Sequence, residues 1–415
     1  MIPLRFLYNI LINTAWFVLK VIALFNGKIK LFVQGRKRAF SILEEQLTPT
    51  DKTIWMHVAS LGEFEQGLPI LELLRTKYPE HKLVLTFFSP SGYEVKKNTS
   101  AADVVVYLPM DSNSKVKRFL NLVDPELAIF IKYEVWPNYL HHLKKRKVPT
   151  ILVSAIFSKR QIYFKSYGGF MRNNLRKFDY FFVQDKKSKK LLESIGITNT
   201  SISGDTRLDR VSEILNRNNQ LAFMDRFKND QLCLVAGSTW PEDEEILIDY
   251  INSTSEKLKF VIAPHEIKPG HVEKITSGLK KPTVCYSELK DQVLEEFDVL
   301  VIDTIGLLTK IYSYADIAYV GGGFATGLHN TMEPAVFGIP IIIGPQYDGF
   351  KEAEDLVSIG GIIPISNKKS FGKLMKGFIN NPASTRSIGD INSNYINSNK
   401  GAAGLIMKRI SQDYL

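Results

Sequence analysis

The chain has 415 residues, of which 45% are hydrophobic and 23% are charged, so it is long enough for two globular domains and its composition excludes a disordered protein. Its two cysteines, Cys233 and Cys285, lie in separate apolar runs, which excludes a disulfide framework and a thiolate metal site and indicates a reducing compartment. The formal net charge of +10 favours anionic partners such as acidic lipids, phosphorylated substrates or nucleic acid.

The first patterned segment covers residues 2–25, which are apolar apart from four polar positions, Arg5, Asn9, Asn13 and Lys20. At 100° per residue these positions fall within an arc of about 80°. Five basic residues follow, at 28, 30, 36, 37 and 38. This pattern favours a helix lying in the headgroup region of an anionic leaflet over a spanning helix, because Asn and Lys are costly in hydrocarbon. A helix docked on the protein's own core is a third alternative.

We therefore expect residues 1–33 to form a membrane-associated anchor, with residues 1–38 contacting anionic lipids. After the anchor, β-branched runs alternate with amphipathic segments, which is typical of a parallel sheet with crossover helices. The first half predicts one doubly wound, Rossmann-like domain over residues 34–211, with strands at 54–58, 83–88, 104–108, 127–131, 150–153, 180–183 and 200–202. Helices are expected between them, among others at 69–77, 115–122, 139–145 and 186–195.

Residues 212–230 contain Asn-rich clusters and predict a helical connector. A second Rossmann-like domain is expected over residues 231–380, with strands at 232–236, 260–263, 283–285, 299–302, 317–320, 341–343 and 362–363, the last ended by Pro364. Residues 381–415 are expected to be helices that can pack back on the first domain. Two such α/β domains in tandem favour a donor bound to the second and an acceptor bound to the first.

Ligands of open α/β sheets bind beyond the carboxyl ends of the strands, so functional side chains are expected in the segments that follow the strands. Strand 54–58 runs into a turn in which Gly62 would allow tight geometry and Glu63 stands at a strand-to-helix corner. A carboxylate there can accept a proton from a hydroxyl. The alternative is an acidic residue placed in the first helical turn by the helix dipole, and position alone does not separate the two.

Two further segments of the first half carry charge. Glu134 lies in residues 132–138, directly after a buried strand, where it needs solvent, a partner or a ligand; the alternative is an ion pair at a helix start. Arg207 can offset phosphate charge, or it can form an interdomain salt bridge with Asp205 or Asp209.

In the second half, residues 237–240 precede an acidic helix start, where Ser and Thr serve equally well as caps or ligands. Residues 320–334 are more informative. Three glycines let the backbone approach a ligand, and a following helix would offer N–H groups to a phosphate. Asn330 and Glu333 are three residues apart on one face, and Glu333 can bind ribose hydroxyls. Together these features favour a nucleotide sugar.

Four ordered motifs resemble those of the bacterial 3-deoxy-D-manno-octulosonic acid (Kdo) transferases: WMHVASLGE at 55–63, EVWPN at 134–138, GDTRLD at 204–209 and HNTMEP at 329–334. The resemblance implies a GT-B fold, in which two Rossmann-like domains enclose a cleft. It also implies an inverting glycosyltransferase that moves Kdo from CMP-Kdo to a lipid A precursor of the lipid IVA type in lipopolysaccharide inner-core biosynthesis. The expected location is the cytoplasmic face of the inner membrane, without a cofactor.

By motif position, the resemblance makes Glu63 the general base and places Glu134 and Arg207 where the family has transition-state-stabilising residues. It assigns CMP-Kdo binding to His265, Ile305, Gly306, Leu307, Asn330, Thr331, Met332 and Glu333. Three positions depart from the family pattern. Arg207 stands where many members have Lys, Pro264 where many have Arg, and residues 154–156 are Ser-Ala-Ile in place of Asn-Ala-Arg. Arg207 keeps the positive charge but changes its reach. Pro264 removes a contact with the phosphate or the base, and the change at 154–156 affects contacts with the acceptor.

There are two alternatives, a related enzyme and a protein of a different class. A GT-B enzyme that uses a UDP-sugar in cell-envelope synthesis would need contacts for a diphosphate. The second alternative is a basic, non-enzymatic protein that binds membranes or nucleic acid. Nucleic-acid binding is disfavoured, because the lysines of residues 186–190 lack interleaved aromatic residues. We expect no nucleic-acid partner. No divalent metal is expected either, because the chain contains no Asp-x-Asp element.

Overall fold

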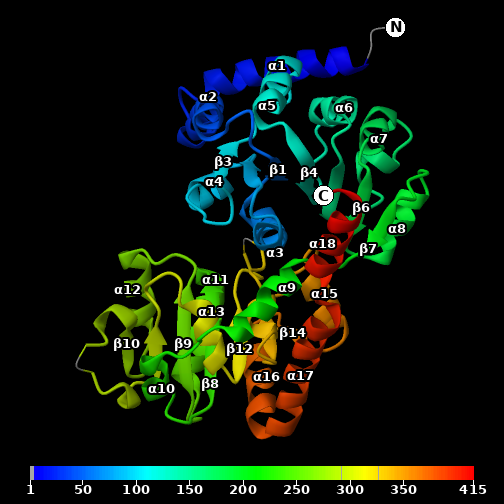
Figure 1. Ribbon diagram of the computed structural model, residues 1–415. Coiled ribbons are helices and arrows are strands. Elements are labelled where there is room, and N and C mark those ends of the chain that lie inside the picture. Colours follow the sequence, from blue (N-terminus) through cyan, green and yellow to red (C-terminus); the bar gives the residue numbers. More distant parts are fainter. Residues whose placement is uncertain (1–3, 291, 326) are drawn as a thin grey trace. The chain divides into compact units, whose positions relative to one another are not determined.

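The computed structural model describes residues 4–290, 292–325 and 327–415, so residues 2 and 3 of the expected anchor and Thr326 of the glycine-rich segment lie outside the described residues. The chain forms two compact units, one made of Met1–Arg210 with Lys400–Leu415 and the other of Val211–Asn399. Each unit is built on a seven-stranded parallel sheet flanked by helices (Figure 1). The predicted α/β fold class is confirmed.

The first sheet has the strand order β3-β2-β1-β4-β5-β6-β7. Its central strands are buried on both faces, as expected for a parallel sheet covered by helices. The strands are β1 (Thr53–Val58), β2 (Lys82–Phe87), β3 (Val104–Tyr107), β4 (Pro125–Ile131), β5 (Thr150–Ala155), β6 (Tyr180–Val183) and β7 (Thr200–Ile202). The helices are α1 (Leu4–Ile22), α2 (Gly27–Gln46), α3 (Leu61–Lys77), α4 (Pro90–Lys96), α5 (Asn113–Val123), α6 (Pro137–Arg146), η1 (Ile162–Phe164), α7 (Gly169–Leu175), α8 (Lys186–Glu193), α9 (Arg207–Ser212) and α18 (Ala402–Asp413).

Helix α18 belongs to the first unit although it follows the whole second unit in sequence. It packs on α3, and Ala403, Ile406, Met407 and Ile410 join the core formed by β1, β2, β4 and α3. This core lies under α3, the helix that begins at the carboxyl end of β1. The sequence-distant α18 therefore supports the helix on which Glu63 stands.

The second sheet has the order β10-β11-β9-β8-β12-β13-β14. Its strands are β8 (Cys233–Thr239), β9 (Lys259–Pro264), β10 (Thr283–Cys285), β11 (Val299–Val301), β12 (Ile317–Val320), β13 (Ile341–Ile343) and β14 (Ile362–Pro364). The helices are η2 (Glu213–Asn216), α10 (Ala222–Lys228), α11 (Pro241–Ser253), α12 (Pro269–Gly278), η3 (Tyr286–Glu288), η4 (Leu294–Glu296), α13 (Leu308–Ile311), η5 (Tyr312–Tyr314), α14 (Met332–Ala335), α15 (Lys351–Ser358), α16 (Lys368–Asn380) and α17 (Pro382–Asn399).

Two local expectations were wrong, and a third, a helix after the glycine-rich segment, is met by only one helical turn. Helix α3 begins at Leu61, so Pro69 lies inside it, and Gly62 is an ordinary helical residue beside which an added Cβ would meet nothing. The helix expected after the glycine-rich segment is the single turn α14, which Gly338, at φ +70°, ends soon after. Pro364 belongs to β14 and does not end the strand before it, which an edge strand tolerates because one of its sides lacks ladder partners.

Candidate active site

Glu63 stands in the first turn of α3, directly beyond the carboxyl end of β1. Its side chain folds back so that the Ala59 N–H donates to Oε2 at 2.6 Å, and the residue is only 7% exposed. Within the part of the chain that the structure describes, the Glu63 carboxylate accepts no other hydrogen bond, and Oε1 keeps access to solvent. Oε1 is therefore open to a proton from a substrate hydroxyl.

The pKa of Glu63 is raised from 4.5 to about 7, first by burial and second by the nearby charge of Glu134. The Ala59 hydrogen bond and the Lys132 ammonium act in the opposite direction but do not offset these two causes. A carboxylate with a pKa near neutrality exists in both protonation states under physiological conditions. That property suits a general base.

Glu134 follows β4 and is held by two donors on the same oxygen. His57 Nε2 lies 3.0 Å from Oε2, and the Trp136 indole N–H donates to it at 2.8 Å. His57 is completely buried within β1, and its Nδ1 lies 2.8 Å from the Thr86 hydroxyl of the neighbouring strand. These contacts fix the orientation of Glu134 beside Glu63.

Arg207 begins α9 and forms an ion pair with Asp205, Nη2 donating to Oδ2 at 2.7 Å and Nε to the same atom at 3.0 Å. Burial works against ionisation of Asp205, but the charge and hydrogen bonds of Arg207, together with a hydrogen bond from Gln66, hold the pKa of that carboxyl below its ordinary value. The salt bridge considered from sequence is therefore present with Asp205, inside the first unit. Asp209 instead accepts hydrogen bonds from the N–H groups of Gly401 and Ala403.

The turn that carries Arg207 is tied to α3 and β5. Gln66 Nε2 donates to Asp205 at 3.3 Å, one helical turn after Glu63, and the Thr206 hydroxyl donates to the Gln66 carbonyl at 2.6 Å. Ser154, at one of the positions that depart from the family pattern, is fully buried and bonds the Thr206 hydroxyl at 2.9 Å. Its role is to support the Arg207 turn, because a fully buried side chain cannot contact an acceptor.

Tyr133 shows that these charges share one site. The pKa of its hydroxyl is raised by burial and by Glu63, and lowered by Arg207. The preceding Lys132 adopts φ +61°, a left-handed conformation that is uncommon outside glycine and clusters at functional sites. The carboxyl ends of β1 and β4 and the start of α9 thus bring Glu63, Glu134 and Arg207 into one electrostatic environment.

In the second unit, the glycine-rich segment folds against the end of β8. A Cβ on Gly321 would lie 2.4 Å from the Ser238 carbonyl oxygen, so this close approach requires glycine. The completely buried Asp243 holds the segment, its Oδ2 accepting from the N–H groups of Gly322 and Trp240, each at 2.9 Å. The Tyr319 hydroxyl donates to Oδ1 at 2.7 Å.

Three rings meet beyond the carboxyl ends of β8, β9 and β12, where His265 lies against both Trp240 and His329. Trp240 stacks on His265 with centroids 4.7 Å apart, and His265 lies 4.5 Å from His329. The Trp240 indole donates to His329 Nε2 at 3.0 Å, and burial, followed by the neighbouring His265, lowers the pKa of His329 to about 4. His329 is therefore a neutral imidazole that carries its proton on Nδ1. It can donate a hydrogen bond to a phosphate but cannot supply a positive charge.

Asn330 and Glu333 meet as predicted, the amide of Asn330 donating to Oε1 at 3.0 Å. The Thr309 hydroxyl donates to Oε2 at 2.7 Å, which connects this pair to the segment after β11. In that segment Ile305 is 84% exposed and Gly306 adopts φ +94°. Of the other residues expected to bind the donor, Leu307 is partly exposed, whereas Thr331 and Met332 are buried.

The family of the chain follows from its relatives. The family described as 3-deoxy-D-manno-octulosonic-acid transferase (kdotransferase) matches residues 34–210. A 3-deoxy-D-manno-octulosonic acid transferase of Aquifex aeolicus is 30% identical over 308 residues, 73% of this chain and 78% of that protein. The chain belongs to this transferase family. The transferase of the same name from Haemophilus influenzae is 27% identical over 418 residues, 96% of each chain.

Solved structures establish the GT-B type of the fold. The UDP-GlcNAc 2-epimerase of Neisseria meningitidis has a TM-score of 0.62 at 14% identity, covering 87% of this chain and 100% of that one. MurG of Acinetobacter baumannii has a TM-score of 0.56 at 11% identity, covering 87% and 99%. At these identities the likeness concerns the fold alone. The transferase is a glycosyltransferase of GT-B type.

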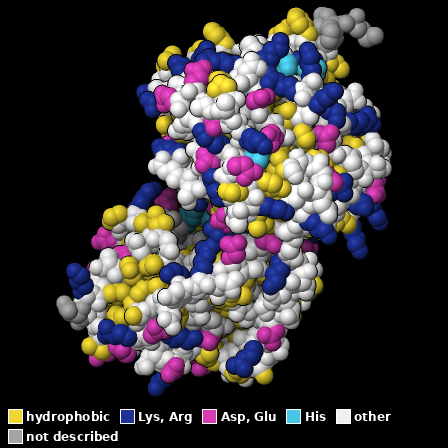
Figure 2. Space-filling view, in the orientation of Figure 1, with side chains coloured by type: hydrophobic (Ala, Val, Ile, Leu, Met, Phe, Trp, Pro, Cys, Tyr) yellow, Lys and Arg dark blue, Asp and Glu magenta, His cyan; other side chains and the backbone are white. Residues whose placement is uncertain are grey.

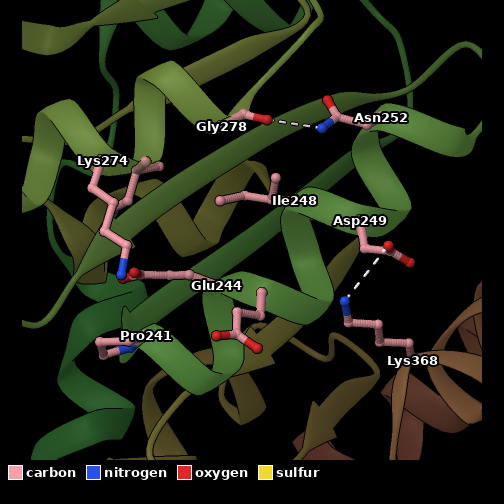
Figure 3. Close-up of a pocket in the computed structure, with 10 residues that line it drawn as sticks. Pro241, Glu244, Ile248, Asp249, Asn252, Lys274, Gly278 and Lys368 are labelled. Carbon is pink, nitrogen blue, oxygen red and sulfur yellow. Dashed lines mark hydrogen bonds and ion pairs between the residues drawn. The ribbon is translucent and has the colours of Figure 1, made fainter.

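A hollow of about 360 Å³ lies elsewhere on the second unit of the transferase, between α11 and α12 (Figure 3). Its lining includes Glu244, Asp249, Lys274 and Lys368, and Lys368 pairs with Asp249 at 3.6 Å. None of the expected donor-site residues lines it. Among residues 4–290, 292–325 and 327–415, no group of three or more His, Cys, Asp or Glu side chains is arranged to hold a metal ion.

Several residues that build the site were not predicted as functional. They are His57, Gln66, Trp136, Trp240 and Asp243. His57 and Asp243 had a detectable signal, because a polar side chain in or beside a buried strand needs a hydrogen-bonding partner. The partners themselves are distant in sequence and could not be identified.

Proposed function

We propose that this transferase moves Kdo from CMP-Kdo to a hydroxyl group of a lipid A precursor of the lipid IVA type, with inversion at the anomeric carbon. The observation that carries the proposal is Glu63, a buried carboxylate with one open oxygen and a pKa of about 7. The names of the relatives support Kdo as the transferred sugar. The CMP ester and the lipid acceptor are expectations from the resemblance of the motifs.

The mechanism follows from the charges of the proposed substrates. The anomeric carbon loses a cytidylate while the acceptor hydroxyl attacks, so the transition state resembles an oxocarbenium ion with growing negative charge on the phosphate. Glu63 takes the proton of the hydroxyl through Oε1. Glu134, held by His57 and Trp136, and Arg207, held by Asp205, are fixed charges that can stabilise the transition state without reorganising.

The donor is assigned to the second unit. The close approaches that require glycine at positions 321 to 323 are to the protein's own backbone, so the glycine-rich segment is assigned a packing role. The donor phosphate is assigned to the neutral His329, which offers Nδ1–H as a donor. The Asn330–Glu333 pair is assigned to the ribose hydroxyls. His265 lies exposed on the Trp240 ring, where a nucleobase can stack.

Membrane attachment is part of the proposal. By length and composition α1 could cross a membrane, a test that core helices and signal sequences also pass. We assign α1 to the cytoplasmic face of the inner membrane, as a peripheral or single anchor, because its apolar residues are exposed and basic residues follow it. Figure 2 shows hydrophobic and basic side chains together at the edge of the first unit over α1 and α2.

The direct test combines purified protein, CMP-Kdo and a lipid IVA type acceptor, with mass spectrometry of the product and NMR of the new anomeric centre. A mass increase of whole Kdo residues with inverted configuration is expected. CMP should compete with the donor and UDP should not. Transfer from a UDP-sugar with no transfer from CMP-Kdo, or strong competition by UDP alone, would contradict the proposal.

A further inference from the structure

Helix α1 is fixed to the first unit by its polar residues. Arg5 donates through Nε to Asn138 Oδ1 at 3.0 Å and through Nη2 to Asn113 Oδ1 at 2.9 Å. Asn9 Oδ1 accepts from the Asn113 N–H at 3.2 Å and from the Asn138 amide at 3.1 Å. The stripe predicted to face lipid headgroups is therefore partly occupied by contacts with the protein's own domain.

These contacts reach the starts of two helices at the carboxyl edge of the first sheet. Asp111, in the loop after β3, accepts from the N–H groups of Asn138 and Tyr139 at 3.1 and 3.0 Å and so caps α6. The Tyr8 hydroxyl of α1 donates to the same carboxylate at 2.8 Å. Since Asn138 comes four residues after Glu134, α1 holds the end of the segment that carries Glu134.

The second half of α1 is fixed by apolar contacts on the same side. Ile12, Trp16 and Leu19 pack against a small core that contains Phe32, Val33 and Met110. Figure 1 shows α1, in dark blue, lying lengthwise across the end of α5. A helix held along its length in this way does not need to cross a bilayer to be stable.

The opposite side of α1 is exposed and apolar. Side chains that are 42–67% exposed cover it: Leu4, Phe6, Leu7, Ile10, Leu11, Phe17, Val18, Val21 and Ile22. Exposed basic residues of α2 follow: Lys28, Lys30, Lys37 and Arg38. An apolar strip next to a basic cluster is complementary to a bilayer surface with anionic headgroups, and a soluble protein rarely exposes such a strip.

We propose that α1 is a docked interfacial helix that couples membrane attachment to the active site: its outer face lies in an anionic bilayer surface while Arg5 and Asn9 position the Glu134 segment. The proposal rests on the proposed function, because it assigns Glu134 to catalysis. It predicts that the polar contacts of α1 affect catalysis even when no bilayer is present.

The decisive variant is Arg5→Met with Asn9→Leu. Leu has nearly the shape of Asn, and Met keeps an unbranched apolar stem in place of the longer Arg side chain, so the two replacements remove the hydrogen bonds and make α1 more apolar. If α1 were only a membrane span, this variant would attach at least as well and work at least as fast. We expect it to sediment with vesicles of phosphatidylglycerol and phosphatidylethanolamine as the wild type does. Its turnover on detergent-dispersed acceptor should fall at least about tenfold, and toward the roughly 10²-fold that a 1 Å misplacement can cost.

Two comparisons complete the test. Asn9→Leu and Asn9→Asp form a matched pair, since Asp keeps the acceptor oxygen, so Asp should restore turnover that Leu loses. Leu11→Ser with Phe17→Ser changes only the outer face and should lower sedimentation with vesicles, with a larger loss on bilayer-embedded than on dispersed acceptor. Wild-type turnover in a folded Arg5→Met, Asn9→Leu protein, or equal losses in the two double variants on dispersed acceptor, would overturn the proposal.

A substrate-free measurement separates this inference from the proposed function. Amide hydrogen exchange over residues 132–140 should accelerate in Asn9→Leu and stay near the wild-type rate in Asn9→Asp. Unchanged exchange in Asn9→Leu would overturn the coupling whatever the enzyme transfers. Absence of Kdo transfer by the wild type, with accelerated exchange in Asn9→Leu, would refute only the proposed function.

Discussion

Replacement of Glu134 by Gln tests how the Glu63 base is tuned. The pKa of Glu63 is about 7, burial being the larger cause and the charge of Glu134 the second. We expect kcat/KM of the wild type to rise with pH along a limb centred near 7, because the base must be ionised. A like charge near a protein surface contributes on the order of 1 kcal/mol or more, which is close to one pH unit. In Glu134→Gln the limb should therefore move down by about one unit and stop above 4.5, because burial remains.

The assay is the initial rate of transfer between about pH 5 and pH 9, fitted for the position of the limb and the height of the plateau. The plateau should also fall, since a transition-state charge is lost, but this loss does not depend on pH. Glu65→Gln is the matched control: it removes a carboxylate two residues from Glu63 that is partly exposed and pairs with Lys96 at 3.3 Å. A limb that stays in place or moves up in Glu134→Gln, or that moves equally in Glu65→Gln, would refute the reasoning.

Three other outcomes are expected. Glu63→Gln should bind CMP-Kdo normally and lose roughly 10²- to 10⁴-fold in turnover. Its thermal unfolding midpoint should exceed that of the wild type above pH 7. The reason is that the wild-type carboxyl, whose pKa is raised from 4.5 to about 7 on folding, loses on the order of 1–3 kcal/mol of folding stability as pH rises through that range. Asp243→Ala leaves the Gly322 and Trp240 N–H groups unsatisfied, so urea unfolding should show a loss of about 2–5 kcal/mol together with weaker CMP binding; unchanged stability would contradict its holding role. Turnover with preformed CMP-Kdo should survive EDTA, since cations and backbone donors stabilise the leaving cytidylate; complete loss restored by magnesium would contradict this.

The sheets were predictable because most strands, the central ones above all, are short apolar runs buried on both faces, so composition and burial coincide. Each predicted strand overlaps an observed strand. Helix starts were harder to predict. The amphipathic pattern marked only residues 69–77, yet α3 begins at Leu61, at the strand-to-helix corner where Glu63 was expected, and carries Pro69 inside it. Tertiary structure outweighed a local signal here.

The candidate site likewise contains one contact that the sequence predicts and one that it does not. Asn330 and Glu333 are three residues apart and meet as predicted, although Asn330 precedes the N-cap of α14 and reaches Glu333 from outside the helix. The contact of His57 with Glu134 joins residues 77 positions apart. Such a pair is created by the adjacency of β1 and β4 in the sheet, which no local pattern specifies.

The return of α18 to the first unit has a consequence for synthesis. The helix that bears Glu63 lacks the cover of Ile406 and Ile410 until all of Val211–Asn399 has been translated. At 5–20 residues per second, this interval lasts about 10 to 40 s. During it the apolar side of α3 is open to chaperones or to misfolding, so the first unit, although it begins first on the ribosome, is completed last.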